Sequence, residues 1–195
     1  MGEFKVEKSV YKIPAEDSYF LDLIWIEPVD FGNGPAYKWH WKLSDIEAQK
    51  EWKDVPVMIT SITSRTPTLE NRFGKFFKAL TGNLAEGETG STEELAMASF
   101  RVKGFIEHKE VKVEGKAEPQ TFCNVTKLIE NTAKKGEGEG INGASNKLRP
   151  IINEYLAKVN KPLLKIEEEK EKTTSGQAQK TTTRTDAPKK KDISW

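Results

Sequence analysis

Aromatic and basic side chains alternate along one short segment of this chain. In the run Tyr-Lys-Trp-His-Trp-Lys-Leu over 37–43, every second residue is apolar and the residues between them are basic. Strict alternation with a period of two predicts a β-strand with rings on one face and cations on the other. Because rings stack on bases and cations bind phosphates, this pattern favours binding to single-stranded nucleic acid. The candidate residues in this segment are Lys38, Trp39, His40, Trp41 and Lys42.

A later segment repeats this pattern. Arg101, Lys103 and Phe105 share one face of an expected strand, and Arg65 follows the end of another. We expect the basic residues to neutralise phosphates and Phe105 to stack on a base, together with one or more of the rings from 37–43. The alternative interpretation is that those rings fill a core, since a strand usually turns its apolar face inward.

Patterns for catalysis, metals and cofactors are absent from the sequence. Ser-His-Asp and Cys-His chemistry both need a His as the base, and the two His residues at 40 and 108 lie in expected strands. A single Cys123 excludes an internal disulfide and a Cys-based zinc site. The Gly-x-Gly-x-x-Gly spelling at 138–143 lies in a polar, glycine-rich stretch rather than between a strand and a helix. We therefore expect no enzyme, no cofactor and no metal site.

Hydrophobic periodicity predicts the elements that position these residues. A helix is expected to begin at Thr66-Pro67, to carry an apolar stripe from Leu69 to Leu80 and to end at Gly82. One further helical turn is expected over 92–96. Apolar, β-branched and aromatic runs bounded by turn residues predict strands over 18–30, 37–43, 55–64, 100–112 and 119–130.

This order predicts a mostly β fold with one helix between the third and fourth strands. A five-stranded barrel of the oligonucleotide/oligosaccharide-binding type (OB fold) over 18–130 is the expected architecture, and an open α+β sandwich is the alternative. The other expected parts are an N-terminal extension (1–17), a flexible linker (131–147), a short helix within 148–165 and a disordered basic tail (166–195).

Charge divides the chain into an acidic and a basic part. Residues 1–130 carry a net charge of −4 and residues 131–195 carry +5, which favours a polyanionic partner for the basic part. Ile193 and Trp195 end the tail as an apolar tip, and we expect them to bind a protein partner. Because no apolar run is long enough to cross a bilayer, we expect no membrane contact and a cytoplasmic location.

Three segments together resemble a known group of proteins. These are 37–43, the run from Thr60 through the helix to Gly82, and Thr121-Phe-Cys-Asn-Val-Thr-Lys-Leu128. They are similar to segments of small bacteriophage proteins found near replication and recombination genes, which are thought to be OB-fold, single-stranded-DNA-binding-like proteins. The resemblance implies non-sequence-specific binding of single-stranded DNA in phage replication or recombination, inside the host cell. A module that docks on a replication or recombination enzyme without touching nucleic acid is the alternative, and a carbohydrate-binding barrel is a third.

Overall fold

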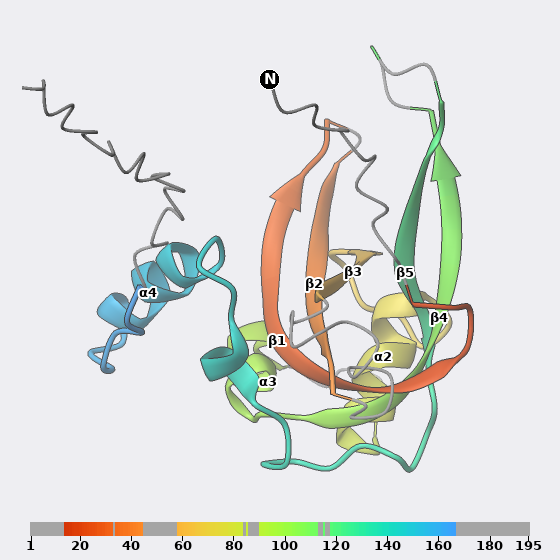
Figure 1. Cartoon of the computed structure of the whole chain (residues 1–195). Coiled ribbons are helices and arrows are strands. Elements are labelled where there is room, and N and C mark those ends of the chain that lie inside the picture. The colour runs from red at the N-terminus through yellow and green to blue at the C-terminus, as the bar shows by residue number, and fades with distance from the viewer. Residues whose placement is uncertain are drawn as a thin grey trace, which may run out of the picture.

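The structure is a computed structural model that describes residues 14–32, 34–44, 58–83, 85, 90–112, 115 and 118–166. These residues form a mostly β structure with several helices (Figure 1), and the five expected strands are all present. The elements in chain order are β1 (Ser18–Asp30), β2 (Pro35–Leu43), β3 (Met58–Ser64), α2 (Arg72–Thr81), α3 (Thr92–Met97), β4 (Arg101–Val111), β5 (Gln120–Leu128), the 3₁₀ helix η1 (Gly140–Gly143) and α4 (Arg149–Lys158).

The five strands pair into a ring in the order β1-β2-β3-β5-β4. β1 lies antiparallel between β2 and β4, and the β2–β3 and β4–β5 pairs are also antiparallel. A parallel contact between β3 and β5 at one residue pair, Thr60 with Asn124, completes the ring. Beyond this contact, β4 and β5 continue as a two-stranded hairpin, drawn in green on the right of Figure 1.

Aromatic side chains from β2 and α2 fill the inside of the ring. Trp39 and Trp41 are both 0% exposed, and their rings stack with centroids 5.8 Å apart. Phe76 packs edge-on against both of them and Phe73 against Trp39. The structure therefore confirms the interpretation in which the apolar face of 37–43 belongs to the core.

The helix between β3 and β4 begins later than the expected start at 66–67. The side chain of Asn71 caps it by accepting a hydrogen bond from the Gly74 N–H at 2.9 Å. The residues before Asn71 form a turn instead, so Leu69 lies outside the helix and is 55% exposed rather than part of the buried stripe. The expected end is confirmed, because Gly82 adopts a left-handed φ of 78° as the C-terminal cap.

A bulge in β1 directs two neighbouring side chains into a second core. The pairing of β1 with β2 shifts between Leu23 and Trp25, and both Ile24 and Trp25 join a buried cluster separate from the main core. The rest of this cluster comes from α3, η1 and the α4 region, with Ala96, Ala144, Leu148, Ile152 and Leu156. β1 is consequently buried without interruption from Leu21 to Ile26.

Residues 131–147, here called the belt, pack along the ring and are not the flexible linker expected from their glycines. Lys134 forms an antiparallel bridge with Arg101, and their two N–H···O distances are 2.7 and 3.0 Å. A Cβ at Gly138 would lie 2.5 Å from the carbonyl oxygen of Phe100, so only a glycine lets the belt approach that closely. The glycines at this point serve close packing and not flexibility.

The two ends of the chain lie mostly outside the described residues. Of the expected N-terminal extension, residues 14–17 are described and run beside β4, with the Ile106 N–H donating to the Asp17 carbonyl at 2.9 Å. The expected disordered tail lies outside the described residues after Ile166, and so do the candidate partner-binding residues Ile193 and Trp195. In the described part of the chain, no helix has the length and apolar character needed to cross a membrane.

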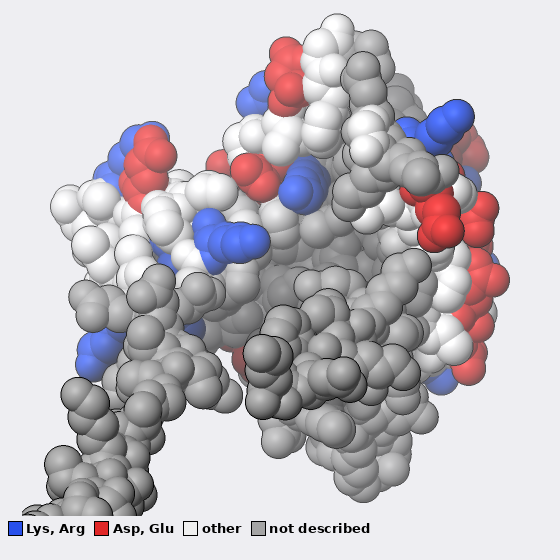
Figure 2. Space-filling view, turned by 45° about the horizontal axis from the view of Figure 1, so that its top comes forward, with Lys and Arg blue, Asp and Glu red and all other residues white. Residues whose placement is uncertain are grey.

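The charge division of the sequence is also a division in space. On the face shown in Figure 2, several Lys and Arg side chains lie at the left end, where α4 lies in Figure 1, and others are spread over the rest of this face. Asp and Glu side chains line the right edge, on the side of β4 and β5. The basic end and the acidic edge therefore lie on opposite sides of the molecule.

Candidate functional site

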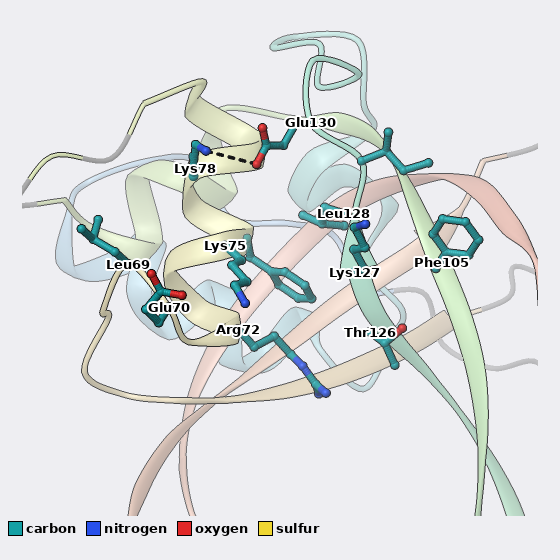
Figure 3. Close-up of a pocket in the computed structure, with 12 residues that line it drawn as sticks. Leu69, Glu70, Arg72, Lys75, Lys78, Phe105, Thr126, Lys127, Leu128 and Glu130 are labelled. Atoms are coloured by element: carbon teal, nitrogen blue, oxygen red, sulfur yellow. Dashed lines mark hydrogen bonds and ion pairs between the residues drawn. The ribbon is translucent and has the colours of Figure 1, made fainter.

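An open groove of about 1020 Å³ runs between α2 and the second half of β5 (Figure 3). α2 buries Phe73, Phe76 and Leu80 on its inner face, so its outer face supplies one wall of the groove. β5 and the residues just after it supply the other wall, and Phe105 of β4 lies at its side. The groove is positioned by the packing of α2 against the ring rather than by a free loop.

Four cations and two carboxylates line this groove: Arg72, Lys75, Lys78, Lys127, Glu70 and Glu130. Lys78 pairs with Glu130 at 3.2 Å, but both side chains are more than half exposed, so this pair contributes at most about 1 kcal/mol. The Arg72 guanidinium lies 3.5 Å from the Ile62 carbonyl oxygen. Within the described residues, neither Lys75 nor Lys127 has a carboxylate within ion-pair distance. The groove can therefore offer cations to an anionic ligand.

An exposed aromatic surface adjoins the groove. Phe105 is 41% exposed and lies directly across the β4–β5 pair from Lys127. Phe20, which is 40% exposed, lies across the β1–β4 pair from Lys103, and the Lys103 ammonium is 5.9 Å from the centre of the Phe20 ring. We call the groove together with Phe20, Lys103 and Phe105 the candidate interface. Its rings can stack on flat apolar groups while its cations bind phosphates.

Two of the candidate residues from the sequence, Lys103 and Phe105, belong to this interface, whereas Trp39 and Trp41 do not. Both indoles are buried, and their N–H groups donate to Thr63 Oγ1 at 3.0 Å and Ser61 Oγ at 3.2 Å. Because neither ring offers a face to solvent, the expectation that β2 aromatics stack on bases is wrong for these two residues.

His40 is also buried, at 6% exposure, and its Nε2 lies 3.0 Å from a carboxylate oxygen of Glu27. Burial lowers the pKa of His40 below its ordinary value of 6.5, although the hydrogen bond to Glu27 acts in the opposite direction. The neutral imidazole is therefore favoured in the folded protein. Lys38, two residues earlier and half-buried, lies across the β1–β2 pair from the same Glu27.

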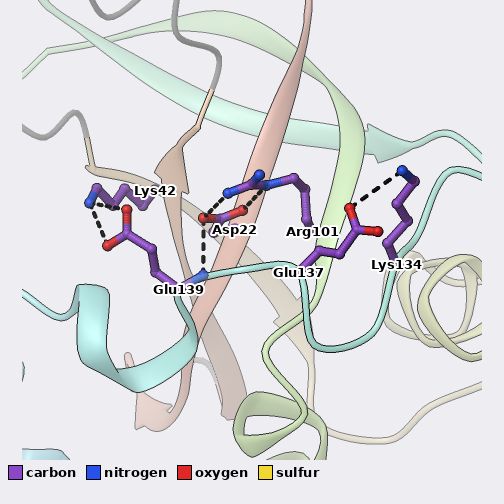
Figure 4. A network of polar contacts seen from close by, with 6 residues as sticks. All are labelled: Asp22, Lys42, Arg101, Lys134, Glu137 and Glu139. Carbon is purple, nitrogen blue, oxygen red and sulfur yellow. Dashed lines mark hydrogen bonds and ion pairs between the residues drawn. The ribbon is translucent and has the colours of Figure 1, made fainter.

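Lys42 and Arg101 are held in a polar network that fastens the belt to the ring (Figure 4). The Arg101 guanidinium donates two hydrogen bonds to Asp22, at 2.8 and 3.0 Å, and this contact raises the pKa of Arg101. Asp22 is 0% exposed and also accepts a hydrogen bond from the Glu139 N–H at 3.1 Å. Lys42 is paired with the Glu139 carboxylate at 2.5 and 2.6 Å. These cations serve the fold, and their charges are already balanced.

Arg65 stands apart from both groups. Its guanidinium lies 5.6 Å from the centre of the Tyr37 ring, and its side chain is exposed at the end of β3. It does not line the groove. Of the nine candidate residues of the sequence, the structure therefore brings only Lys103 and Phe105 to the interface.

Sequence reasoning missed most of the groove. Arg72, Lys75 and Lys78 recur every three residues along α2, which places them on one helical face, but such a stripe also suits a solvated surface. Lys127 and Glu130 carry no pattern of their own. Only the pairing of β4 with β5 and the packing of α2 bring these residues to one groove.

The described residues hold no cluster of three or more His, Cys, Asp or Glu side chains that could bind a metal ion. Cys123 is half-buried, and burial raises the pKa of its thiol, with the charge of Glu16 adding to the effect. A raised pKa keeps the thiol protonated, which is the opposite of what a nucleophilic Cys needs. The absence of enzymatic activity stays a prediction.

No protein-family model, curated protein or solved structure matches this chain. The resemblance to phage proteins thus stays a prediction that rests on the sequence segments alone.

Proposed function

We propose that this protein binds single-stranded DNA, without sequence preference, along the candidate interface. The observation that carries the proposal is the meeting of an exposed ring, Phe105, with Lys75 and Lys127 at one open groove, two cations without an ion-pair partner among the described residues. Proteins that bind single strands without sequence preference combine a cationic groove for the backbone with aromatic rings for the bases. The resemblance to phage proteins supports a role in phage replication or recombination.

We further propose that the ring is an OB fold. The antiparallel order β4-β1-β2-β3 is that of a Greek key, and the helix α2 lies between the third and fourth strands. OB folds commonly bind ligands over the face of the second and third strands. In this chain Lys42 is paired with Glu139 of the belt and His40 with Glu27, so the α2–β5 side is the better place for a nucleic acid.

A single strand suits this surface better than a duplex. Phe20 and Phe105 can stack only on bases that are not already stacked within a double helix. The groove beside Phe105 carries Glu70 and Glu130 as well as its four cations, so it is less suited to the evenly charged outside of a duplex than a wholly basic surface would be.

Fluorescence anisotropy with a labelled oligonucleotide tests this function. The full chain is titrated with a single strand of about 16 nucleotides, and with the matching duplex, at several salt concentrations. We expect the single strand to bind more tightly, with log K falling by about 0.7 per decade of salt for each phosphate neutralised. Binding that is undetectable, independent of salt or stronger for the duplex would contradict the proposal.

A protein-docking role is the second candidate, because apolar side chains are exposed at α4. Ile151, Val159 and Leu163 are 39, 41 and 58% exposed. In that case the protein would dock on a replication or recombination enzyme through this end, and the oligonucleotide titration would show no binding.

A further inference from the structure

The exposed surface at the end of the molecule beyond the belt is both basic and apolar. We define the α4 surface by six exposed residues of α4 and the segment after it: Ile151, Lys158, Val159, Lys161, Leu163 and Lys165. Glu154 is the acidic residue among the described residues of this stretch, and it is paired with Lys158 at 3.1 Å. Among the described residues, the surface therefore combines apolar area with an excess of positive charge.

This surface is held rigid from beneath. Ile152 and Leu156 on the inner face of α4 are 0 and 1% exposed within the second core. The Asn153 side chain fixes the segment after the helix by bonding both backbone groups of Leu164, at 2.7 and 2.9 Å. The Arg149 guanidinium donates to the Lys165 carbonyl. Because the backbone is fixed, the outward side chains form a defined surface instead of a frayed end.

The same molecule carries a surface of opposite charge on its far side. Glu16, Asp17, Glu107 and Glu110 are all exposed along the β4 side of the hairpin, with Glu107 and Glu110 on opposite faces of the strand, and we call them the acidic edge. Glu16 lies next to β4, because its carboxylate accepts a hydrogen bond from the His108 N–H at 2.7 Å. Lys109 and Lys112 are the cations in this region. On the face shown in Figure 2, Asp and Glu side chains are more numerous along the right edge than at the left end.

We propose that the α4 surface of one copy binds the acidic edge of a second copy. Opposite charges attract across such a contact, and the apolar residues Ile151, Val159 and Leu163 would be removed from water in it. Because the two surfaces lie on opposite sides of one molecule, the contact is head-to-tail and can repeat from copy to copy. This inference concerns self-association and does not depend on the proposed nucleic-acid binding.

Sedimentation velocity of the full chain tests the proposal without any ligand. At about 50 mM salt we expect species larger than a dimer to grow with protein concentration, and at about 500 mM salt we expect the monomer. A chain that stays monomeric at every concentration at low salt, or a closed dimer that does not grow further, would overturn the proposal.

Paired charge reversals identify the two surfaces. Lys158→Glu with Lys161→Glu reverses the α4 surface, and Glu107→Lys with Glu110→Lys reverses the acidic edge. We expect each double variant alone to lose association by about tenfold or more, whereas an equimolar mixture of the two restores it, because each then finds its complement. These side chains are exposed, and circular dichroism checks that each variant folds. Association that survives either reversal, or a mixture that does not associate, would show that the contact lies elsewhere.

Discussion

Phe105 is an exposed aromatic residue, and a cationic residue, Lys127, lies directly across the β4–β5 pair from it. The phenyl group of Phe105 projects from the five-stranded sheet into solvent. Replacing Phe105 by Ala therefore removes a contact to the ligand and changes the core little. Phe122 is a matched control, since it is also exposed, at 45%, and lies farther along the same hairpin.

We expect Phe105→Ala to weaken single-strand binding by about 1–3 kcal/mol, the value of one base stacked on one ring. The free energy of unfolding should change by less than about 0.5 kcal/mol, as for other exposed positions. Anisotropy titrations and urea denaturation measure the two quantities. Equal losses of affinity in Phe105→Ala and Phe122→Ala would argue against a specific stacking role for Phe105.

His40 makes the stability of the fold depend on pH. Its pKa in the folded protein lies below the ordinary value of 6.5, because burial penalises the charged imidazole. The unfolded chain therefore takes up the proton first as the pH falls. The contribution of His40 to stability is complete above pH 6.5 and is lost below it, toward the lower pKa of the folded state.

We expect the free energy of unfolding to fall between pH 7 and about pH 5.5, and His40→Gln to reduce that fall. Gln has no proton to gain in this range but can still donate to Glu27. Urea denaturation at the two pH values measures the difference for each protein. A fall of the same size in His40→Gln would assign it to other groups.

At the scale of elements, α2 serves the core and the interface at once. Its inner face buries Phe73 and Phe76 against the two Trp residues, and its outer face presents Arg72 and Lys75 to the groove. Any ligand of the groove therefore binds to an element whose position is fixed by a large aromatic core. The cap at Asn71 also helps to fix the position of α2, because it determines the residue at which the helix begins.

The belt is the element whose sequence is most misleading. Its Gly-rich, polar composition is typical of linkers, yet Asp22 and Arg101 hold it, and Gly138 lies against the Phe100 backbone. Amino-acid composition indicates how much conformational freedom the backbone of a segment has. It does not indicate whether the folded chain offers a surface against which that segment packs. The partner residues of the belt are far away in the sequence, so no local pattern could reveal them.

Gly138→Ala distinguishes a packed belt from a linker. The added Cβ would lie 2.5 Å from a backbone oxygen, which cannot move aside as a side-chain tip could. We expect a loss of about 1–3 kcal/mol in stability, as for other overpacked sites, and faster proteolysis within the belt. Asn142→Ala, at an exposed position of η1, is the control and should change neither. An unchanged melting temperature in Gly138→Ala would restore the linker interpretation.

At the scale of the whole molecule, the sequence predicts the elements better than the site. Alternation over 37–43, the apolar stripe of α2 and the cap at Gly82 are local signals, and each corresponds to an observed element. Which lysines remain free is not a local property. Lys42 and Arg101 are balanced by Glu139 and Asp22, whereas Lys127 has no ion-pair partner in the part of the chain that the structure describes, and only the folded chain decides these pairings.

The surface of the molecule then divides into three regions with separate tasks. The groove between α2 and β5 is the proposed site for single-stranded DNA, and the α4 surface and the acidic edge are proposed to join successive copies. Phe105 and Lys127 are not among the residues reversed at the two contact surfaces, so each proposal has its own variants. Phe105 nevertheless borders the acidic edge, because Glu107 follows it by two residues on β4.

The central claim is that the free cations of the groove bind the DNA backbone, and a comparison of two charge reversals tests it most directly. Lys75→Glu with Lys127→Glu reverses the groove, and Lys135→Glu with Lys147→Glu makes the same charge change at exposed positions outside it. Salt titrations of both against a single strand should show that the groove variant alone loses affinity, with a salt slope shallower by about 1.4 for two lost phosphate contacts. If instead the variant at Lys135 and Lys147 shows the greater loss, or the two lose affinity equally, the groove is not the DNA-binding site.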